Sequence, residues 1–169
     1  STLSMGVPVT EAKAECSDVS IGAMGWASGE VITAVATFVL EQGYGCSVLV
    51  VPTDTVPAVT SLAENGQPDI APEVWKNSAT IYDELEASGK VITASNVFAN
   101  GSEEGWWIPT SLAKKHPELK TLEGVLANPE LVGSRFHNCP VGWGCRIVND
   151  NLKIVHQLEA NGIEVFDHS

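Results

Sequence analysis

The pattern of apolar positions in the first fifty residues predicts a strand, a helix and a second strand. Residues 19–24 and 46–51 are short apolar runs rich in β-branched side chains, which is typical of buried strands. Between them, apolar residues recur at helical spacing over residues 28–42, with Ser28 as the expected N-cap and Gly43 as the expected left-handed residue after the last turn. A helix that links two neighbouring strands makes them parallel, so this stretch predicts a βαβ unit of an α/β sheet.

The rest of the chain predicts shorter elements. The run Asn149-Asp150-Asn151 is interpreted as a helix N-cap, because its spacing does not match a calcium loop. Gly162 begins a final apolar run that stops without a visible partner strand. The expected elements are a strand over 69–74, a helix over 81–88 that ends at Gly89, an extended stretch over 91–99, a strand over 104–108, a helix from Pro109 that stops before Pro117, a helix over 119–126, a helix over 151–160 and a strand over 162–166.

Composition and charge limit the classes of partner. The chain has 169 residues, of which 44% are hydrophobic, enough for one domain or two small lobes. Nine Lys and Arg residues against 21 Asp and Glu residues give a net charge of −12, which argues against nucleic acid and against anionic membrane surfaces as partners. No apolar run reaches the roughly 18 residues of a transmembrane helix. Residues 1–13 show no signal-peptide pattern, so an exported protein would be represented here in its mature form.

The four cysteines fall into two groups that favour two disulfides. Cys16 precedes the first predicted strand and Cys46 begins the second, and neighbouring strands lie about 4.8 Å apart, within reach of a disulfide. Cys139 and Cys145 enclose a Gly- and Pro-containing loop that a bridge closes easily. Buried thiols in a cytosolic protein, a metal site with His137 and a catalytic Cys145 are alternatives, but no further metal ligand or base stands at a fitting spacing. We therefore predict an oxidising compartment and neither a metal nor a cofactor.

Five tryptophans are a high number for this length, and most lie where regular structure is expected to break. Trp26 follows the first predicted strand, Trp75 ends the third, and Trp143 lies in the cysteine-bounded loop. Trp106 and Trp107 are consecutive on a predicted strand, so at most one of them reaches the same cleft. A single tryptophan is most often a core residue. Three at one rim favour an aromatic cage for a methylated ammonium ion, in which each ring contributes about 0.5–2 kcal/mol.

Several motifs follow one another in a characteristic order. They are Ile21-Gly22 to Trp26 followed by Glu30, Leu40-Glu41-Gln42-Gly43-Tyr44, Asp69-Ile70 to Glu73-Val74-Trp75, Glu104-Gly105-Trp106-Trp107-Ile108-Pro109 and Cys139-Pro-Val-Gly-Trp-Gly-Cys145. In this order they resemble the glycine betaine/choline-type substrate-binding proteins of ABC importers. The Gly-Trp-Gly-Cys loop is the most specific of them.

The resemblance implies a fold and a cellular place. It implies an α/β protein of the type II periplasmic binding-protein class, with two lobes and a ligand cleft between them, exported to the periplasm or the cell surface. Residues 1–93 would form the N-terminal part of the first lobe and residues 94–169 the beginning of the second. Members of the family are about twice as long, so the chain is expected to cover about half of the fold, as a fragment or with its other half supplied by a separate piece.

The resemblance also implies which aromatic residues bind the ligand. Trp26, Trp75 and Trp143 match positions of cage aromatics in the family. Trp107 is similar to a further cage aromatic of the choline-binding branch, although Trp106 is an alternative for that role. One remaining cage aromatic would be expected in the half of the family fold that the chain does not cover.

The residues that contact the polar end of the ligand differ between branches of the family. In betaine-binding relatives the backbone N–H groups at the positions of Gly144 and Cys145 hold the ligand carboxylate, and amide donors suit an anion. Glu73 is our best candidate for a carboxylate near the cation, because it precedes Trp75 by two positions and would share its strand face. Ala79 stands where some betaine-binding relatives have a His, and Ser28 where the choline branch has an Asp.

The sequence thus predicts a solute receptor and not an enzyme. It would capture a small methylated amine, which is glycine betaine, choline or trimethylamine N-oxide, and deliver it to an ABC transporter permease in the membrane. The alternatives are a ligand-sensing module of the same fold, an enzyme that acts on methylated amines through Cys145 or a carboxylate pair, and a structural fragment that binds nothing. Four disulfide-bonded cysteines would remove the thiol nucleophile of the enzyme alternative.

Overall fold

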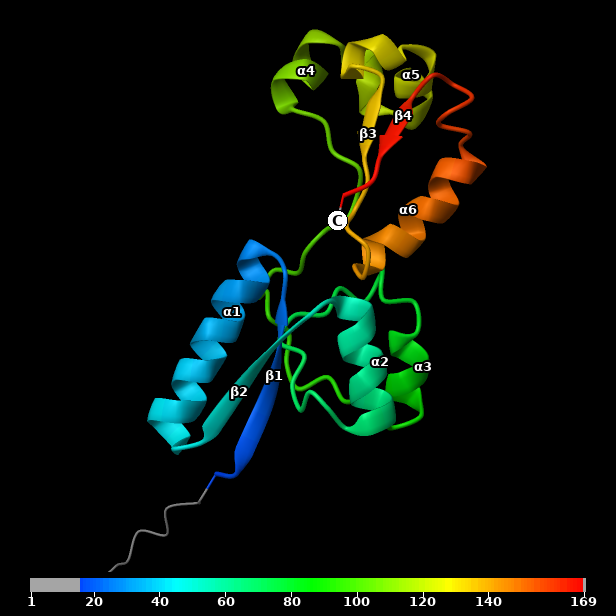
Figure 1. Ribbon diagram of the computed structural model, residues 1–169. Helices are drawn as coiled ribbons and strands as arrows, with labels where there is room; N and C mark the ends of the chain where they lie inside the picture. The colour runs from blue at the N-terminus through cyan, green and yellow to red at the C-terminus, as the bar shows by residue number, and fades with distance from the viewer. Residues whose placement is uncertain (1–15, 169) are drawn as a thin grey trace, which may run out of the picture.

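The computed structural model describes residues 16–168, so residues 1–13, where a signal peptide was considered, lie outside it. Within this range the strands form two separate parallel pairs. β1 (Asp18–Met24) pairs with β2 (Ser47–Thr53), and β3 (Arg135–His137) pairs with β4 (Glu164–Phe166). Figure 1 shows each pair within its own group of helices, with the loop after the third helix leading from one group to the other.

The predicted βαβ unit at the start of the chain is confirmed. Helix α1 (Ala27–Phe38) continues as the π-helical turn η1 (Val39–Gly43) and connects β1 to β2, which run parallel over seven paired residues. Two details of the prediction are wrong. The N-cap of α1 is Trp26 rather than Ser28, and Gly45, with φ of 70°, takes the left-handed conformation instead of Gly43, which stays inside the π-helical turn.

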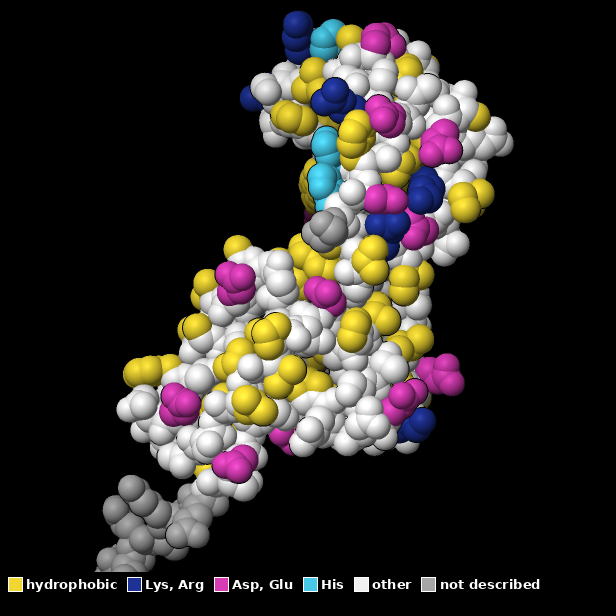
Figure 2. Space-filling view, in the orientation of Figure 1, with side chains coloured by type: hydrophobic (Ala, Val, Ile, Leu, Met, Phe, Trp, Pro, Cys, Tyr) yellow, Lys and Arg dark blue, Asp and Glu magenta, His cyan; other side chains and the backbone are white. Residues whose placement is uncertain are grey.

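The side of α1 that is buried differs from the apolar stripe seen in the sequence. Its buried residues are Gly29 and Thr33. Val31, Val35 and Phe38 of the stripe are 63%, 58% and 66% exposed. Figure 2 shows hydrophobic side chains at the surface of the lower group, where Figure 1 draws α1 and β2. Helical spacing identified the element, therefore, but not the face that packs on the sheet.

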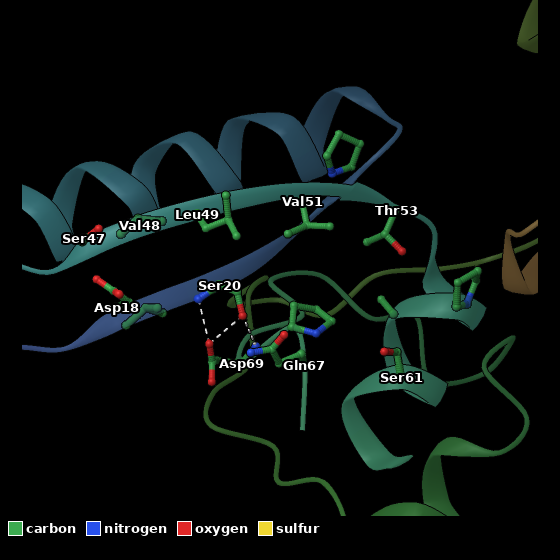
Figure 3. Close-up of a pocket in the computed structure, with 15 residues that line it drawn as sticks. Asp18, Ser20, Ser47, Val48, Leu49, Val51, Thr53, Ser61, Gln67 and Asp69 are labelled. Atoms are coloured by element: carbon green, nitrogen blue, oxygen red, sulfur yellow. Dashed lines mark hydrogen bonds between the residues drawn. The ribbon is translucent and has the colours of Figure 1, made fainter. Parts of the chain in front are cut away.

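The predicted third strand over residues 69–74 is reduced to one parallel bridge, between Ile21 and Ile70. Asp69 anchors this segment to β1, because its carboxylate accepts hydrogen bonds from the backbone N–H and the hydroxyl of Ser20 at 2.7 and 2.6 Å (Figure 3). These hydrogen bonds, the side-chain one first, hold the pKa of Asp69 below its usual value. Pro72 has no N–H to donate, so the ladder does not continue beyond the bridge.

The core of the first group lies between two helices. Helix α2 (Thr55–Asn65) was not predicted, because its first half is rich in β-branched residues and contains Pro57, which a helix tolerates in its first turn. Helix α3 (Tyr82–Ala87) agrees with the predicted helix over 81–88, and Gly89 has a φ of 73° after it. The buried core cluster contains Val59, Ala79, Tyr82 and Val91.

The second group begins with short helices. Helix α4 (Thr110–Lys115) stops before Pro117 as predicted. The predicted helix over 119–126 is divided into the 3₁₀ turn η2 (Pro117–Lys120) and helix α5 (Leu122–Ala127), and a further 3₁₀ turn, η3 (Pro129–Val132), follows. The predicted strand over 104–108 is wrong, because these residues have no regular secondary structure.

Two predictions near the end of the chain are corrected. Helix α6 (Gly144–Val155) begins seven residues before the predicted helix over 151–160, so Asn149-Asp150-Asn151 lies inside the helix and does not cap it. The final strand β4 has a partner after all, namely β3, for which the sequence predicted no element. Both predicted disulfides, Cys16–Cys46 and Cys139–Cys145, are present.

Candidate functional site

Four of the five tryptophans line one pocket of about 330 Å³. Trp26 and Trp75 come from the first group of elements, and Trp107 and Trp143 from the part of the chain that follows it. The other lining residues are Thr55, Ser78, Glu103, Glu104, Gly105, Cys139, Gly144 and Cys145. Residues more than a hundred positions apart are therefore brought to the same place.

The positions of Trp26 and Trp75 follow from the parallel arrangement of the strands. Trp26 lies two residues after the end of β1, and Trp75 follows the segment that is bridged to β1 at Ile70. Both residues therefore lie at the carboxyl edge of the sheet. Trp143 is the N-cap residue of α6, and its ring meets that of Trp26 edge to face, with centroids 5.1 Å apart. Phe98 packs against Trp75, with ring centroids 6.1 Å apart. The rings support one another as well as enclosing the pocket.

The two consecutive tryptophans point to different surroundings. Trp107 lines the pocket and is 73% exposed. Trp106 donates its indole N–H to Asn149 of α6 at 2.8 Å and packs against Phe136 of β3, with ring centroids 4.6 Å apart. The structure thus places Trp107 in the pocket lining and Trp106 outside it. Only one of the two adjacent side chains reaches the pocket, as expected, although neither residue lies on a strand.

Glu73 binds the N–H edges of two of the rings and is absent from the pocket lining. Its side chain is buried, and Oε1 accepts hydrogen bonds from the indole N–H of Trp26 at 2.8 Å, the indole N–H of Trp75 at 2.8 Å and the hydroxyl of Ser28 at 3.0 Å. Gly29 makes room for this arrangement, since a Cβ there would lie 3.2 Å from Trp26 Nε1. The structure therefore holds Glu73 at the N–H edges of two indoles that line the pocket, outside the lining itself.

The N-terminus of α6 forms another wall of the pocket. Gly144 and Cys145 are its first two residues, and backbone N–H groups in the first turn of a helix have no partner inside that helix. Gly144 is packed so closely that a Cβ would lie 2.8 Å from the backbone oxygen of Ser78. The loop before it is closed by the Cys139–Cys145 disulfide. Gly142, with φ of 97°, accepts a hydrogen bond from Val56 N–H of α2 at 3.2 Å.

The charged side chains at the pocket are acidic. Glu103 and Glu104 are exposed residues of the lining. Among the described residues that line the pocket there is no Lys, Arg or His. Ala79, at the position where some betaine-binding relatives have a His, is buried in the core of the first group instead. Sequence reasoning also missed Thr55 and Ser78, although Ser78 follows Trp75 by only three positions.

An ion-pair network fixes α6 against the end of β4. Arg146 binds Asp150 at 2.9 Å and Asp167 at 3.0 Å, and Lys153 binds Asp150 at 2.8 Å. The hydrogen bond from Lys153, with further ones from Arg146 and Asn138, lowers the pKa of Asp150 to about 2. The network therefore stabilises the position of α6, whose first turn lines the pocket.

A second hollow, of about 640 Å³, lies between β1, β2 and α2 (Figure 3). Leu49 and Val51 of β2 and Ser61 of α2 are among the residues that line it. None of the tryptophans and none of the other ligand residues predicted from the sequence belong to its lining. We therefore consider the tryptophan-lined pocket as the candidate site.

Comparison with known proteins gives the family. The family model described as the substrate binding domain of ABC-type glycine betaine transport system matches residues 17–169. A search among curated proteins found no match. Within residues 16–168, no helix has the length and apolar character needed to span a bilayer.

The family match carries several consequences. Its members have the type II periplasmic binding-protein fold, are solute-binding domains and not enzymes, and act outside the cytoplasmic membrane together with a membrane permease. The enzyme alternative is therefore wrong. The match extends over nearly the whole sequence, and the chain belongs to the family of substrate-binding domains of ABC-type glycine betaine transport systems.

Proposed function

We propose that this chain binds a small trimethylammonium compound in the tryptophan-lined pocket and delivers it to an ABC permease, with glycine betaine favoured over choline and trimethylamine N-oxide. The observation that carries the proposal is the gathering of Trp26, Trp75, Trp107 and Trp143 around one pocket whose described lining has no cationic side chain. The pocket volume of about 330 Å³ is ample for a ligand of this size.

A trimethylammonium head group matches this lining for a physical reason. Its positive charge is spread over methyl groups that offer no conventional hydrogen-bond donor, so polar side chains cannot replace the water that it loses. Indole faces can, because their electron-rich π systems attract a cation by about 0.5–2 kcal/mol per ring at a desolvated site. Glu103 and Glu104 also line the pocket, and their negative potential favours a cation over an anion near them.

The first turn of α6 favours a ligand with an anionic end. Gly144 and Cys145 present two consecutive backbone N–H groups, and the helix dipole adds a partial positive charge there. A carboxylate has two oxygens to accept both donors, whereas the hydroxyl of choline and the oxygen of trimethylamine N-oxide supply one oxygen each. This difference, together with the family description, is our reason for placing glycine betaine first.

The proposal includes a two-lobed receptor with the ligand between the lobes. The boundary expected from the sequence, with residues 1–93 in one lobe and 94–169 in the next, divides the pocket lining into Trp26 and Trp75 on one side and Trp107 and Trp143 on the other. A ligand that contacts both sides stabilises the closed arrangement by its differential affinity, which is how such receptors signal occupancy to a permease.

Ligand titration tests the proposal. Calorimetry and tryptophan fluorescence should show saturable binding of glycine betaine to the full chain, with weaker binding of choline and trimethylamine N-oxide and none of glycine. Trp75→Ala should weaken glycine betaine binding by about tenfold or more, since it removes one ring of the cage. Trp106→Ala is the matched control, because this indole lies outside the pocket. Absence of binding for all three methylated amines would refute the proposal.

A further inference from the structure

Glu73 is a buried carboxylate next to an aromatic pocket. The residue is only 2% exposed, three donors converge on its Oε1, and Oε2 finds no hydrogen-bond partner within residues 16–168. Burial of a carboxylate is costly unless its charge is compensated. Three donors that converge on one oxygen stabilise negative charge on it.

No cation of the described chain neutralises this charge. The ion pairs within residues 16–168 involve Lys76, His116, Arg146 and Lys153, and Glu73 takes part in none of them. Its neighbours are instead two indole N–H groups and one hydroxyl, which are neutral. A carboxylate is thus held at the N–H edges of two rings that also line the pocket, and it forms no ion pair with a cation of residues 16–168.

We propose that Glu73 is the counter-charge of the ligand's cationic head group and acts through Trp26 and Trp75, so that the pocket selects a positively charged head over a neutral one of the same shape. This inference rests on the proposed function, because it concerns the specificity of the same pocket. It assigns Glu73 a positioning and electrostatic role without contact with the ligand.

Two physical effects support this role. First, an indole N–H that donates to a carboxylate is polarised, which makes the ring faces more negative and strengthens their attraction for a cation. Second, the carboxylate attracts the cation directly across a low-dielectric wall of aromatic side chains, where solvent screens the charge less than in water. Neither effect acts on a neutral ligand, which gains only burial and van der Waals contact.

The hydrogen bonds also fix the geometry of the cage. Both indole N–H groups meet the same oxygen at 2.8 Å, so the orientation of Trp26 is coupled to that of Trp75 across 49 positions of sequence. Ser28 donates to that oxygen as well, at 3.0 Å, and ties the carboxylate to the first turn of α1. If Glu73 only positioned the rings, its replacement would weaken charged and neutral ligands equally. A comparison of the two kinds of ligand therefore separates the effect of its charge from the effect of its positioning.

The test compares two substitutions and two ligands of one shape. Glu73→Gln keeps a carbonyl oxygen that can accept from the indoles but removes the charge, whereas Glu73→Asp keeps the charge. The ligands are choline and its neutral carbon analogue 3,3-dimethylbutan-1-ol, with dissociation constants measured by calorimetry and by competition. We expect Glu73→Gln to weaken choline binding by about tenfold, equivalent to about 1.4 kcal/mol, and to change binding of the alcohol by less than about twofold. Glu73→Asp should retain a preference for choline.

An indole signature shows that the substitution acts through the rings. In ¹H–¹⁵N spectra, Glu73→Gln should shift the indole signals of Trp26 and Trp75 but leave that of Trp106, whose partner is Asn149, in place. Equal weakening of both ligands, or unchanged choline binding, would overturn the charge role. If the unsubstituted chain binds none of the methylated amines, the proposed function itself has failed, and the assignment of Glu73 fails with it.

Discussion

Gly144→Ala is the substitution for which the structure gives the sharpest expectation. Gly144 is the first residue of α6 and belongs to the pocket lining. A Cβ built on it would lie 2.8 Å from the backbone oxygen of Ser78, 2.9 Å from its backbone carbon and 2.9 Å from its hydroxyl oxygen. Two of these three atoms are backbone, so a rotation of the Ser78 side chain cannot relieve the clash. Either the start of α6 or the segment after Trp75 has to move.

The expected cost is modest in stability and larger in binding. Overpacking of this kind costs about 1–3 kcal/mol, and the reduced backbone entropy of the unfolded alanine variant returns about 0.4–1 kcal/mol. For a chain of this size each kcal/mol lowers Tm by about 2–4 °C. Displacement of α6 also moves Trp143 and the first N–H groups of the helix away from the opposing rings, and we expect glycine betaine affinity to fall by about tenfold or more.

Two other glycines provide matched controls. Gly43→Ala meets nothing nearer than 4.0 Å and should leave binding unchanged while raising stability by up to about 1 kcal/mol. In Gly124→Ala the new Cβ would clash with the backbone oxygen of Glu118 in the 3₁₀ turn η2, so this substitution should lower Tm. Gly124 lies outside the pocket lining, so the substitution should not weaken glycine betaine binding beyond the effect of that loss of stability.

The assay is thermal unfolding of each variant without ligand, followed by calorimetric titration with glycine betaine well below Tm. If Gly144→Ala binds glycine betaine as tightly as the unsubstituted chain, the contact between Ser78 and Gly144 does not set the pocket geometry, and the reasoning is wrong. The same conclusion would follow if Gly124→Ala and Gly144→Ala reduced affinity to the same extent.

Three further predictions concern single features. Trp107 is 73% exposed, so Trp107→Ala should change the free energy of unfolding by no more than about 0.5 kcal/mol. The same substitution should weaken glycine betaine binding, as measured by calorimetry. The bond from Lys153 lowers the pKa of Asp150 to about 2, so this carboxyl adds stability that is complete above about pH 4 and is lost as pH falls through about 2. Its side chain is 41% exposed, which screens the contribution to about 1 kcal/mol, and Asp150→Asn should remove that acid-dependent part in urea unfolding curves. Replacement of Cys16 and Cys46 by Ser opens a bridge that spans 30 positions and should cost about 3–4 kcal/mol in the same assay.

The parts of the fold that depend on local pattern could be predicted from the sequence. β1, α1 and β2 form a βαβ unit, because a run of β-branched residues on either side of a helical spacing leaves few other arrangements. The Cys16–Cys46 disulfide follows from the same reasoning, since parallel pairing brings the starts of β1 and β2 together and places Cys16 near Cys46. Pairings between distant short segments carry no such signal, and β3 was accordingly missed.

Helix boundaries depended on tertiary context in two places. The start of α6 was predicted too late because Gly144 is a poor helix former and Asn149-Asp150-Asn151 matches a cap, whereas the disulfide to Cys139 and the packing against Ser78 hold the first turn in helical form. Helix α2 was missed because its β-branched residues lower its intrinsic helix propensity. Burial of Val59 in the core stabilises this helix instead.

At the candidate site, the rings could be predicted but the group that holds them could not. Glu73 was expected to face the ligand because period-two alternation would put it on the same side as Trp75. The backbone leaves the ladder after the Ile70 bridge, so alternation no longer applies, and the carboxylate instead accepts hydrogen bonds from the indole N–H groups of Trp26 and Trp75. A hydrogen bond across 47 positions, such as the one from Trp26 to Glu73, has no signature in a single sequence.

Under the proposed function, the start of α6 limits the length of the ligand. Trp143 contributes a ring that meets Trp26 edge to face, and the very next residues, Gly144 and Cys145, contribute the N–H groups proposed to hold an anion. Because these cation and anion sites are adjacent in one rigid helical turn, they cannot separate to fit a longer molecule. Glycine betaine has a single methylene between its ammonium and carboxylate and can reach both. A zwitterion with several intervening carbons has to give up one of the two contacts, and its affinity should fall accordingly.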